Sequence, residues 1–198
     1  MDMYSFFMHD ESENNHGYEH MLDFQMSWVM RVAANKDIQK SNPILYKRCF
    51  DILMKLIEKE ECENVEVCNV YVWKQWKYID VHANVEIVCN GKKEKHVVIL
   101  EDKAYTKIHD DQLLRYEETI AEEYDNNDDL KDYSKHKHYW VITFFGYDKK
   151  GYEYKYEVLD RMCKDYYPNW KVLSFEDILD DTTPTGSEHF DDFWIYKW

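Results

Sequence analysis

Three ionisable residues stand at the ends of two strands that the sequence predicts to be neighbours. Glu101 and Lys103 follow an apolar run, and Asp80 lies in an alternating segment before it. Because side chains alternate along a strand, Glu101 and Lys103 project to one face and Asp102 to the other. Carboxylates suit Mg²⁺, and a lysine beside the metal can orient a water molecule or stabilise developing charge. The spacing therefore indicates metal-assisted hydrolysis of a phosphodiester bond, with the backbone carbonyl of Asp102 as a further metal ligand.

The strands that would carry these residues follow from alternation and turn chemistry. Residues 65–73 predict a strand, and in residues 79–88 apolar and polar side chains take turns at successive positions. The Asn-Gly pair at 90–91 suits a tight hairpin turn. The apolar run at 97–100 suits a central strand that is covered on both faces. Such a hairpin places Asp80, in the segment 79–88, beside the end of the apolar run 97–100.

Helices are predicted on both sides of these strands in the sequence. Apolar residues recur at helical spacing over residues 19–34, and Pro43 stands where a second helix can begin. A helix over residues 110–124 and a strand over residues 139–145 follow the apolar run. The remaining expected elements are a helix at 154–166 and a strand at 171–175. This order predicts an α/β fold with a mixed central sheet flanked by helices.

The order of elements and the acidic motif together resemble a known family. The expected order is a helix, a three-strand meander, a helix and another strand. The meander bears Asp80 and then the E-x-K of Glu101 and Lys103. This order resembles the αβββαβ core of the PD-(D/E)XK nuclease superfamily. That core is the restriction-endonuclease-like fold. The sequence departs from the usual motif at Ile79, where the family often has proline.

Two further positions extend the resemblance, which covers roughly residues 19–145 by element order. Gln112 and Tyr116 look like the Q-x-x-x-Y helix of several branches, in which the glutamine reaches the active site. They are four residues apart, so they share a helix face. Those branches also tend to carry a glutamate on the first helix, and Glu19 is the best match because it points with the apolar stripe.

The resemblance implies a nuclease that depends on Mg²⁺, or Mn²⁺ in its place, and acts on nucleic acid, with DNA favoured over RNA. It implies that Asp80 and Glu101 hold the metal ion, that Lys103 positions the attacking water, and that Gln112 supports the site. Further members of the implied site are Glu19 and Tyr116.

Ordinary structural roles compete with these assignments. Glu101 and Lys103 could form a salt bridge on a solvated face, and Asp80 alone would be a surface aspartate. Glu86 shares the polar face with Asp80 and is a second candidate ligand. Gln112 and Tyr116 could be residues of the helix surface and of the core.

A rival metal motif lies near the N-terminus. Residues 16–20 match H-x-x-E-H, the inverted signature of zinc proteases, with Glu19 as general base. Gly17 weakens a helix there, and the sequence offers no evident helix that would supply a third ligand. His136 and His138 stand among lysines, where exposure to solvent is the simpler expectation.

The formal net charge of −15 supports an alternative function. DNA binding gains from basic residues that neutralise phosphates, and the candidates for such a patch are Lys74, Lys77, Lys107 and Arg115. The alternative is a non-catalytic protein that uses its acidic surface to bind another protein on a nuclease-like fold.

The remaining features predict a cytoplasmic protein without a membrane segment. No apolar run approaches the roughly 20 residues of a membrane-spanning helix, and the N-terminus lacks the features of a signal peptide. The five cysteines are scattered without a C-x-x-C pair, which predicts free, mostly buried thiols rather than a disulfide framework or a zinc site.

We expect three segments along the chain. Residues 1–18 form an N-terminal arm, residues 19–180 form the nuclease-like domain, and residues 181–198 form an aromatic tail. The tail must cover its own core or a second copy of the chain, as in a homodimer.

Overall fold

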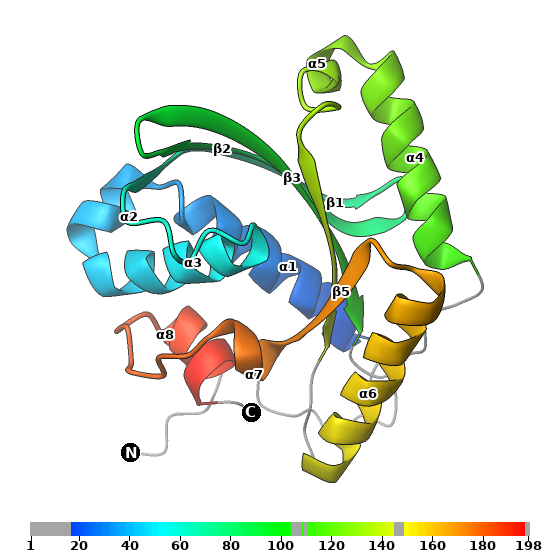
Figure 1. The fold of residues 1–198 in the computed structure, drawn as a ribbon. Helices are drawn as coiled ribbons and strands as arrows, with labels where there is room; N and C mark the ends of the chain where they lie inside the picture. Colours follow the sequence, from blue (N-terminus) through cyan, green and yellow to red (C-terminus); the bar gives the residue numbers. More distant parts are fainter. Residues whose placement is uncertain (1–16, 104–107, 109–110, 145–148, 197–198) are drawn as a thin grey trace.

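A mixed sheet of five strands in the order β1-β2-β3-β4-β5 forms the centre of the protein (Figure 1). The computed structural model describes residues 17–103, 108, 111–144 and 149–196, with the backbone alone at 17–20 and 149–155. The first three strands form an antiparallel meander, whereas β3 pairs with β4, and β4 with β5, in parallel. The strands are β1 (Val65–Trp76), β2 (Ile79–Cys89), β3 (Lys92–Lys103), β4 (Lys137–Phe144) and β5 (Trp170–Ser174).

Helices cover both faces of the sheet. Asn42 caps the helix that begins at Pro43, its side chain accepting a hydrogen bond from the backbone N–H of Leu45 at 3.1 Å. The helices are α1 (Gly17–Val32), α2 (Lys36–Ser41), α3 (Pro43–Leu56), α4 (Gln112–Asn126), α5 (Asp128–Lys131), α6 (Lys149–Tyr166), α7 (Phe175–Ile178), α8 (Glu188–Phe190) and the π-helix η1 (Asp191–Ile195). The short helices α2 and α5 were not among the predicted elements.

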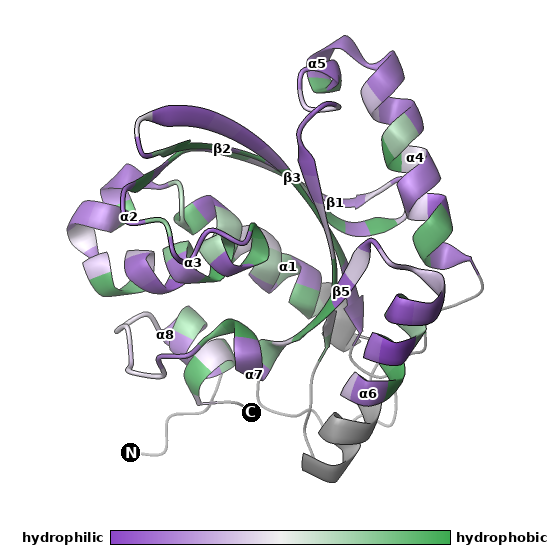
Figure 2. Cartoon of the chain, viewed as in Figure 1, coloured by the Kyte–Doolittle hydropathy of each residue, from purple (hydrophilic) through white to green (hydrophobic). Residues whose placement is uncertain are grey.

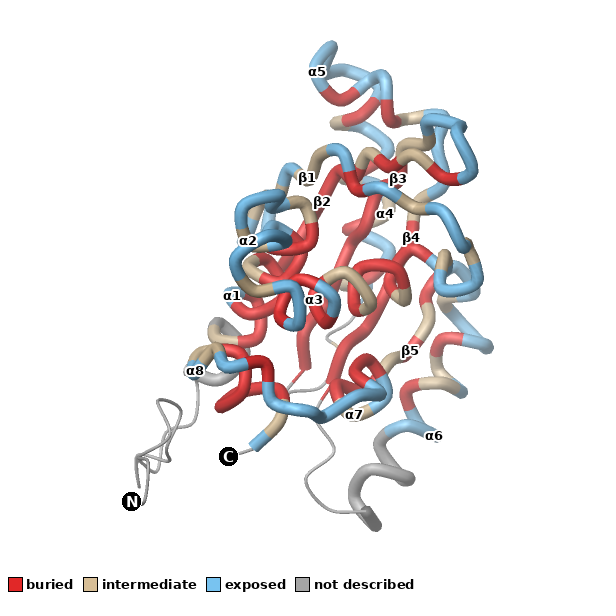
Figure 3. The backbone as a smooth tube through the Cα atoms, turned by 90° about the vertical axis from the view of Figure 1, so that its left-hand side faces the viewer, coloured by how far each residue is buried: buried red, intermediate tan, exposed pale blue. Residues whose placement is uncertain are grey.

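Two hydrophobic cores lie on opposite faces of the sheet. Helices α1 and α3 and the C-terminal helices pack on one face, and α4 and α6 on the other (Figure 1). Strand β3 serves both cores because its side chains alternate: Val98 and Leu100 face the first core, and Val97 and Ile99 face the second. Hydrophobic residues line the central strands in Figure 2, and the same strands are buried in Figure 3.

The aromatic residues near the C-terminus pack into the first core. Phe190, Phe193 and Trp194 are almost completely buried there, and the rings of Phe175 and Trp194 lie 5.2 Å apart. These side chains of the predicted tail therefore cover the core of their own chain.

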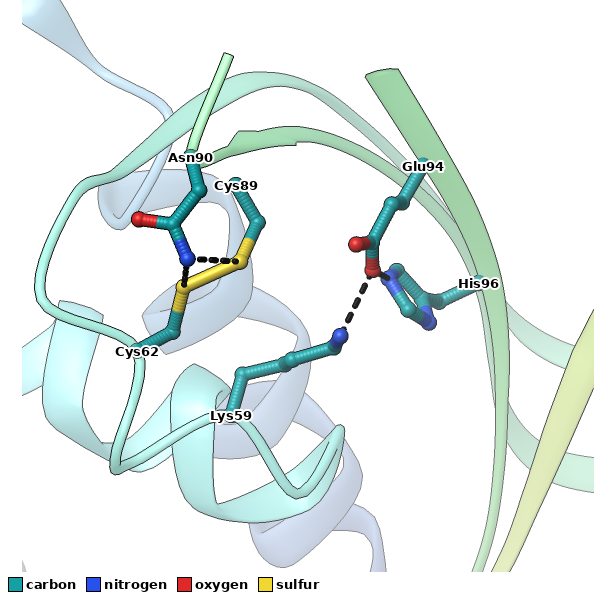
Figure 4. The surroundings of a disulfide bond; sticks show 6 residues. All are labelled: Lys59, Cys62, Cys89, Asn90, Glu94 and His96. Carbon is teal, nitrogen blue, oxygen red and sulfur yellow. Dashed lines mark hydrogen bonds and ion pairs between the residues drawn. A yellow bond between two sulfur atoms is a disulfide. The ribbon is translucent and has the colours of Figure 1, made fainter. Parts of the chain in front are cut away.

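The cysteine prediction was wrong in one respect, because Cys62 and Cys89 form a disulfide (Figure 4). The register of the first hairpin brings them together: Val65, near Cys62 in sequence, is the partner of Cys89 across β1 and β2. Cys49 and Cys163 are free and buried, as expected, whereas Cys68 is free and exposed.

None of the described helices is long and apolar enough to cross a membrane.

Candidate active site at the end of strand β3

The last residues of β3 place the candidate catalytic side chains in the interior of the protein. Glu101 is fully buried and forms an ion pair with Lys103, which lies on the same face of the strand. Gln112, the first residue of α4, donates a hydrogen bond from Nε2 to Glu101 Oε1 at 2.9 Å. Asp102 points to the opposite face, where it accepts a hydrogen bond from the hydroxyl of Thr143 on β4. The alternation of side chains along β3, which the sequence predicts, therefore determines the face on which each of these side chains lies.

Helix α4 links the site to the turn between β1 and β2. Gln112 Nε2 also donates to the hydroxyl oxygen of Tyr116 at 2.9 Å. That hydroxyl in turn donates to the backbone carbonyl of Tyr78 at 2.5 Å. The glutamine and tyrosine of the Q-x-x-x-Y pattern therefore lie side by side, and both belong to the network around Glu101.

Asp80 joins the start of β2 to the end of β3. Its Oδ2 accepts a hydrogen bond from the backbone N–H of Asp102 at 2.9 Å. Its Oδ1 accepts one from Gln75 Nε2 at 3.1 Å. Asp80 is only partly buried, whereas Glu101 is fully buried.

The sequence reading missed three residues that contact this cluster. Asp23 on α1 is buried and accepts a hydrogen bond from Gln75 Nε2 at 2.6 Å. Gln75 therefore bridges Asp23 and Asp80, and Thr143 holds Asp102. The signal that could have revealed Asp23 is its place one helical turn after Glu19, the residue that the resemblance selected.

Other predicted residues lie elsewhere or are not described. Glu19 belongs to α1, but its side chain lies outside the described residues, as do Lys107 and the first histidine of the H-x-x-E-H motif. Glu86 pairs across the strands with Lys95 and accepts a hydrogen bond from the Tyr133 hydroxyl at 2.9 Å, so the structure does not bring it to Asp80. Among the proposed basic residues, Lys77 is engaged by Glu123 on α4, with Nζ and Oε1 2.7 Å apart.

Burial and mutual repulsion perturb the acidic groups. Burial raises the pKa of the Glu101 carboxyl to about 8; the charge of Asp80 adds to the rise, and the Lys103 ammonium opposes it. Burial likewise raises the pKa of Asp102, with the charges of Asp23 and Asp80 as the next causes. Negative charge on Glu101 and Asp102 is therefore disfavoured in this cluster unless a proton or a cation accompanies it.

One buried oxygen fits a metal ligand. Glu101 Oε2 has no hydrogen-bond partner within the described part of the chain, and a buried acceptor without a partner is costly. In the same part of the chain, no group of three or more histidine, cysteine, aspartate or glutamate side chains is arranged to hold a metal ion. The cluster instead offers the carboxylates of Asp80 and Glu101, a set that suits Mg²⁺ because this ion keeps several of its waters.

The five-stranded mixed sheet flanked by helices defines an α/β protein with an acidic cluster where β2 begins and β3 ends. A family model for the PD-(D/E)XK nuclease superfamily matches residues 2–191, and the chain belongs to that superfamily. This confirms the predicted family and the predicted fold class. Members are typically phosphodiesterase nucleases that use a divalent metal ion. No curated protein and no solved structure gave a significant match.

Proposed function

We propose that this protein is a divalent-metal-dependent nuclease that hydrolyses phosphodiester bonds of DNA. One observation carries the proposal: Asp80, Glu101 and Lys103 converge at one end of the sheet, and the buried Oε2 of Glu101 makes no hydrogen bond within the described part of the chain. A cation would satisfy that oxygen and stabilise the ionised form of the buried carboxylate.

In this proposal the carboxylates of Asp80 and Glu101 and the backbone carbonyl of Asp102 hold Mg²⁺, or Mn²⁺ in its place. The bound ion would lower the pKa of a coordinated water and stabilise charge on the scissile phosphate. The Lys103 ammonium orients the attacking water from its position beside Glu101. Gln112 orients the Glu101 carboxylate through the hydrogen bond to Oε1.

Residues around these groups act by positioning them. Tyr116 fixes the side chain of Gln112, and Gln75 holds Asp80 while also contacting Asp23. Glu19, one turn before Asp23 on α1, keeps its proposed supporting role. The preference for DNA rests on the family rather than on any contact in the site.

A second function is favoured by the net charge of −15: an acidic module that binds another protein without catalysis. The convergence of Asp80, Glu101 and Lys103 argues against it, because a site that has lost its activity has no physical need for all three residues.

The decisive test is a cleavage assay on single-stranded DNA, double-stranded DNA and RNA with Mg²⁺, Mn²⁺ or EDTA. We expect metal-dependent cleavage of DNA that falls by about 10²–10³-fold in Lys103→Ala. Lys164→Ala is the matched control, because Lys164 also pairs with a carboxylate, Asp160, but on the surface of α6. A folded protein that cleaves no nucleic acid with any metal would favour the interaction module.

A further inference from the structure

The turn between β1 and β2 has an unusual backbone. Gln75, Lys77 and Tyr78 all have positive φ, at 52°, 54° and 67°. Positive φ is uncommon for residues other than glycine and is least favourable for bulky side chains. Positive φ at both central positions is the geometry that a two-residue hairpin turn of type I′ requires, and Lys77 and Tyr78 occupy these positions between the paired residues Trp76 and Ile79. Glycine and asparagine are the usual residues there, so a tyrosine at this position is uncommon. The contacts that hold this turn are therefore informative.

Two helices hold the turn from opposite sides. On the α1 side, Gln75 Nε2 donates to Asp23 Oδ2 at 2.6 Å. On the α4 side, Lys77 Nζ lies 2.7 Å from Glu123 Oε1, and the carbonyl of Tyr78 accepts the hydrogen bond from Tyr116. The backbone of the turn is thus fixed relative to both layers of helices.

The ring of Tyr78, which this fixed backbone carries, lies in solvent. Tyr78 is 89% exposed, the highest value among the exposed large hydrophobic side chains of the described residues. Its neighbours behave differently: Ile79 is fully buried, and Trp76 packs against the second core. An aromatic ring at the tip of a hairpin, held out of both cores, buries little apolar surface and so adds little to the stability of the fold.

The position of Tyr78 relative to the candidate site is set by a chain of hydrogen bonds. Glu101 contacts Gln112, Gln112 contacts Tyr116, and Tyr116 contacts the carbonyl of Tyr78. Tyr78 also lies two residues before Asp80 in the sequence. A phosphate held at the carboxylates would therefore place a neighbouring nucleotide close to this turn.

We infer that Tyr78 is a stacking platform for an unpaired nucleobase next to the scissile phosphate. This inference rests on the proposed nuclease function and narrows its substrate. An aromatic ring stacks on any base whose face is free, which holds in a single strand, a frayed end or a flipped nucleotide but not inside a continuous duplex. The preferred substrate is therefore DNA with unpaired nucleotides at the cleavage position.

The test measures binding rather than cleavage, so that it does not depend on activity. The Lys103→Ala protein, with Mg²⁺ present, is titrated into fluorescently labelled single-stranded oligonucleotides, and anisotropy gives Kd. Tyr78→Asn is added to this background, because asparagine accepts positive φ while the ring is lost. Tyr78→Trp keeps a stacking ring, and Tyr166→Ala is the control, since Tyr166 is 72% exposed near the end of α6.

We expect Tyr78→Asn to raise Kd by about 5- to 100-fold, as for the loss of one stacked base, with no loss of thermal stability. Tyr78→Trp should retain binding, and Tyr166→Ala should leave Kd unchanged. Replacing the bases of the oligonucleotide one at a time by abasic sites should reveal one position at which Tyr78→Asn causes no further increase in Kd.

The outcomes separate this inference from the function on which it rests. Equal Kd for Tyr78→Asn and its parent, or a loss that persists at every abasic position, would overturn the stacking role and leave the nuclease proposal standing. Failure of every variant to bind any oligonucleotide, together with the absence of cleavage, would overturn both.

Discussion

At the residue scale, Gln75 resolves an electrostatic conflict. Asp23 and Asp80 come from different elements, and both add negative charge to the surroundings of Asp102. One amide nitrogen, Gln75 Nε2, donates to both carboxylates, at 2.6 Å to Asp23 and 3.1 Å to Asp80. Gln75 therefore orients the proposed metal ligand Asp80 without touching the metal itself.

Gln75→Ala tests this positioning role. Loss of the donor should raise the Mg²⁺ concentration that gives half-maximal cleavage by about tenfold, because groups that orient ligands typically change metal affinity by 10- to 100-fold. The measurement is a Mg²⁺ titration of the initial cleavage rate. Gln39→Ala on α2 is the control, since Gln39 is exposed and far from the site in the fold. An unchanged Mg²⁺ dependence in Gln75→Ala would show that Asp80 needs no such support.

The spacing of residues predicted part of this cluster and could not predict the rest. Alternation and the family pattern select Glu101, Lys103 and Gln112, and the structure brings these side chains together; their catalytic roles stay predictions. Only the place of Asp23 one helical turn after Glu19 points to it, because its contact with Gln75 joins residues 52 positions apart, which no local pattern predicts.

At the element scale, strand β2 shows how a polar face can be buried. The sequence pattern sets polar residues on the face opposite Val81 and Ala83, and helix α4 covers that face. Two of those residues, His82 and Asn84, are buried there, and both contact the hydroxyl of Tyr124 on α4. Their shared partner, Tyr124, stands 42 positions after His82 and 40 after Asn84, so strand alternation alone could not predict their burial.

The short helices show a second limit of sequence reading. Helix α2 has six residues and α5 has four, too few for a hydrophobic period to be recognised. Their N-caps, Asn35 and Asn127, are the local features that could have indicated them, since each side chain accepts hydrogen bonds from the first turn.

His82 makes the stability of the sheet depend on pH. Burial, with a smaller effect from His138, lowers the pKa of His82 to about 3 from its usual 6.5. Above pH 6.5 the imidazole is neutral in both the folded and the unfolded chain. Below that pH the unfolded chain binds the proton and the folded chain does not, so stability falls until the pH reaches about 3.

We therefore expect His82→Gln to flatten the acid limb of the stability profile. Each pH unit between 6.5 and 3 should cost the parent protein up to about 1.4 kcal/mol through His82. The variant should be less stable at pH 7.5, since it loses the stacking on Trp73, but should lose less on acidification. Urea unfolding at pH 7.5, 5.5 and 4.5 measures both effects. Parallel profiles for the two proteins would refute the role of His82.

At the scale of the whole molecule, the disulfide and the candidate site lie at opposite ends of β2. Cys89 is the last residue of that strand, and Asp80 is the second. The disulfide joins Cys62, which follows α3, to Cys89 at the end of β2, and so closes a loop across 27 positions of the sequence. It should therefore contribute to stability and not to cleavage.

Reduction, or the double substitution Cys62→Ser and Cys89→Ser, should lower the free energy of unfolding by about 3 kcal/mol, the value expected for a loop of this length. The cleavage rate below the unfolding transition should stay unchanged. Thermal unfolding with and without a phosphine reductant measures the first effect. Cys68→Ser is the control, because Cys68 is free and exposed. A large loss of cleavage in the folded reduced protein would indicate coupling between the two ends of the sheet.

The charge of the whole molecule determines how it can approach DNA. Many lysines on the described surface are already paired with carboxylates, among them Lys36, Lys47, Lys59, Lys77, Lys95 and Lys137. A net charge of −15 opposes the approach of DNA, whose binding normally gains from cations that displace its counterions. We therefore expect the metal ion at the carboxylates to supply much of the positive charge that DNA binding needs.

The excess of acidic residues predicts an unusual salt dependence of DNA binding. A protein with 6–10 phosphate contacts loses about 10³–10⁵-fold in affinity between 50 and 200 mM salt, whereas we expect a loss below about tenfold here. Removal of Mg²⁺ by EDTA should instead abolish binding, because the repulsion between the acidic site and the phosphates is then unopposed. Anisotropy titrations with Lys103→Ala, at fixed Mg²⁺ and increasing NaCl, measure the slope. A steep slope that persists in EDTA would mean that a basic surface, and not the metal, draws the DNA to this protein.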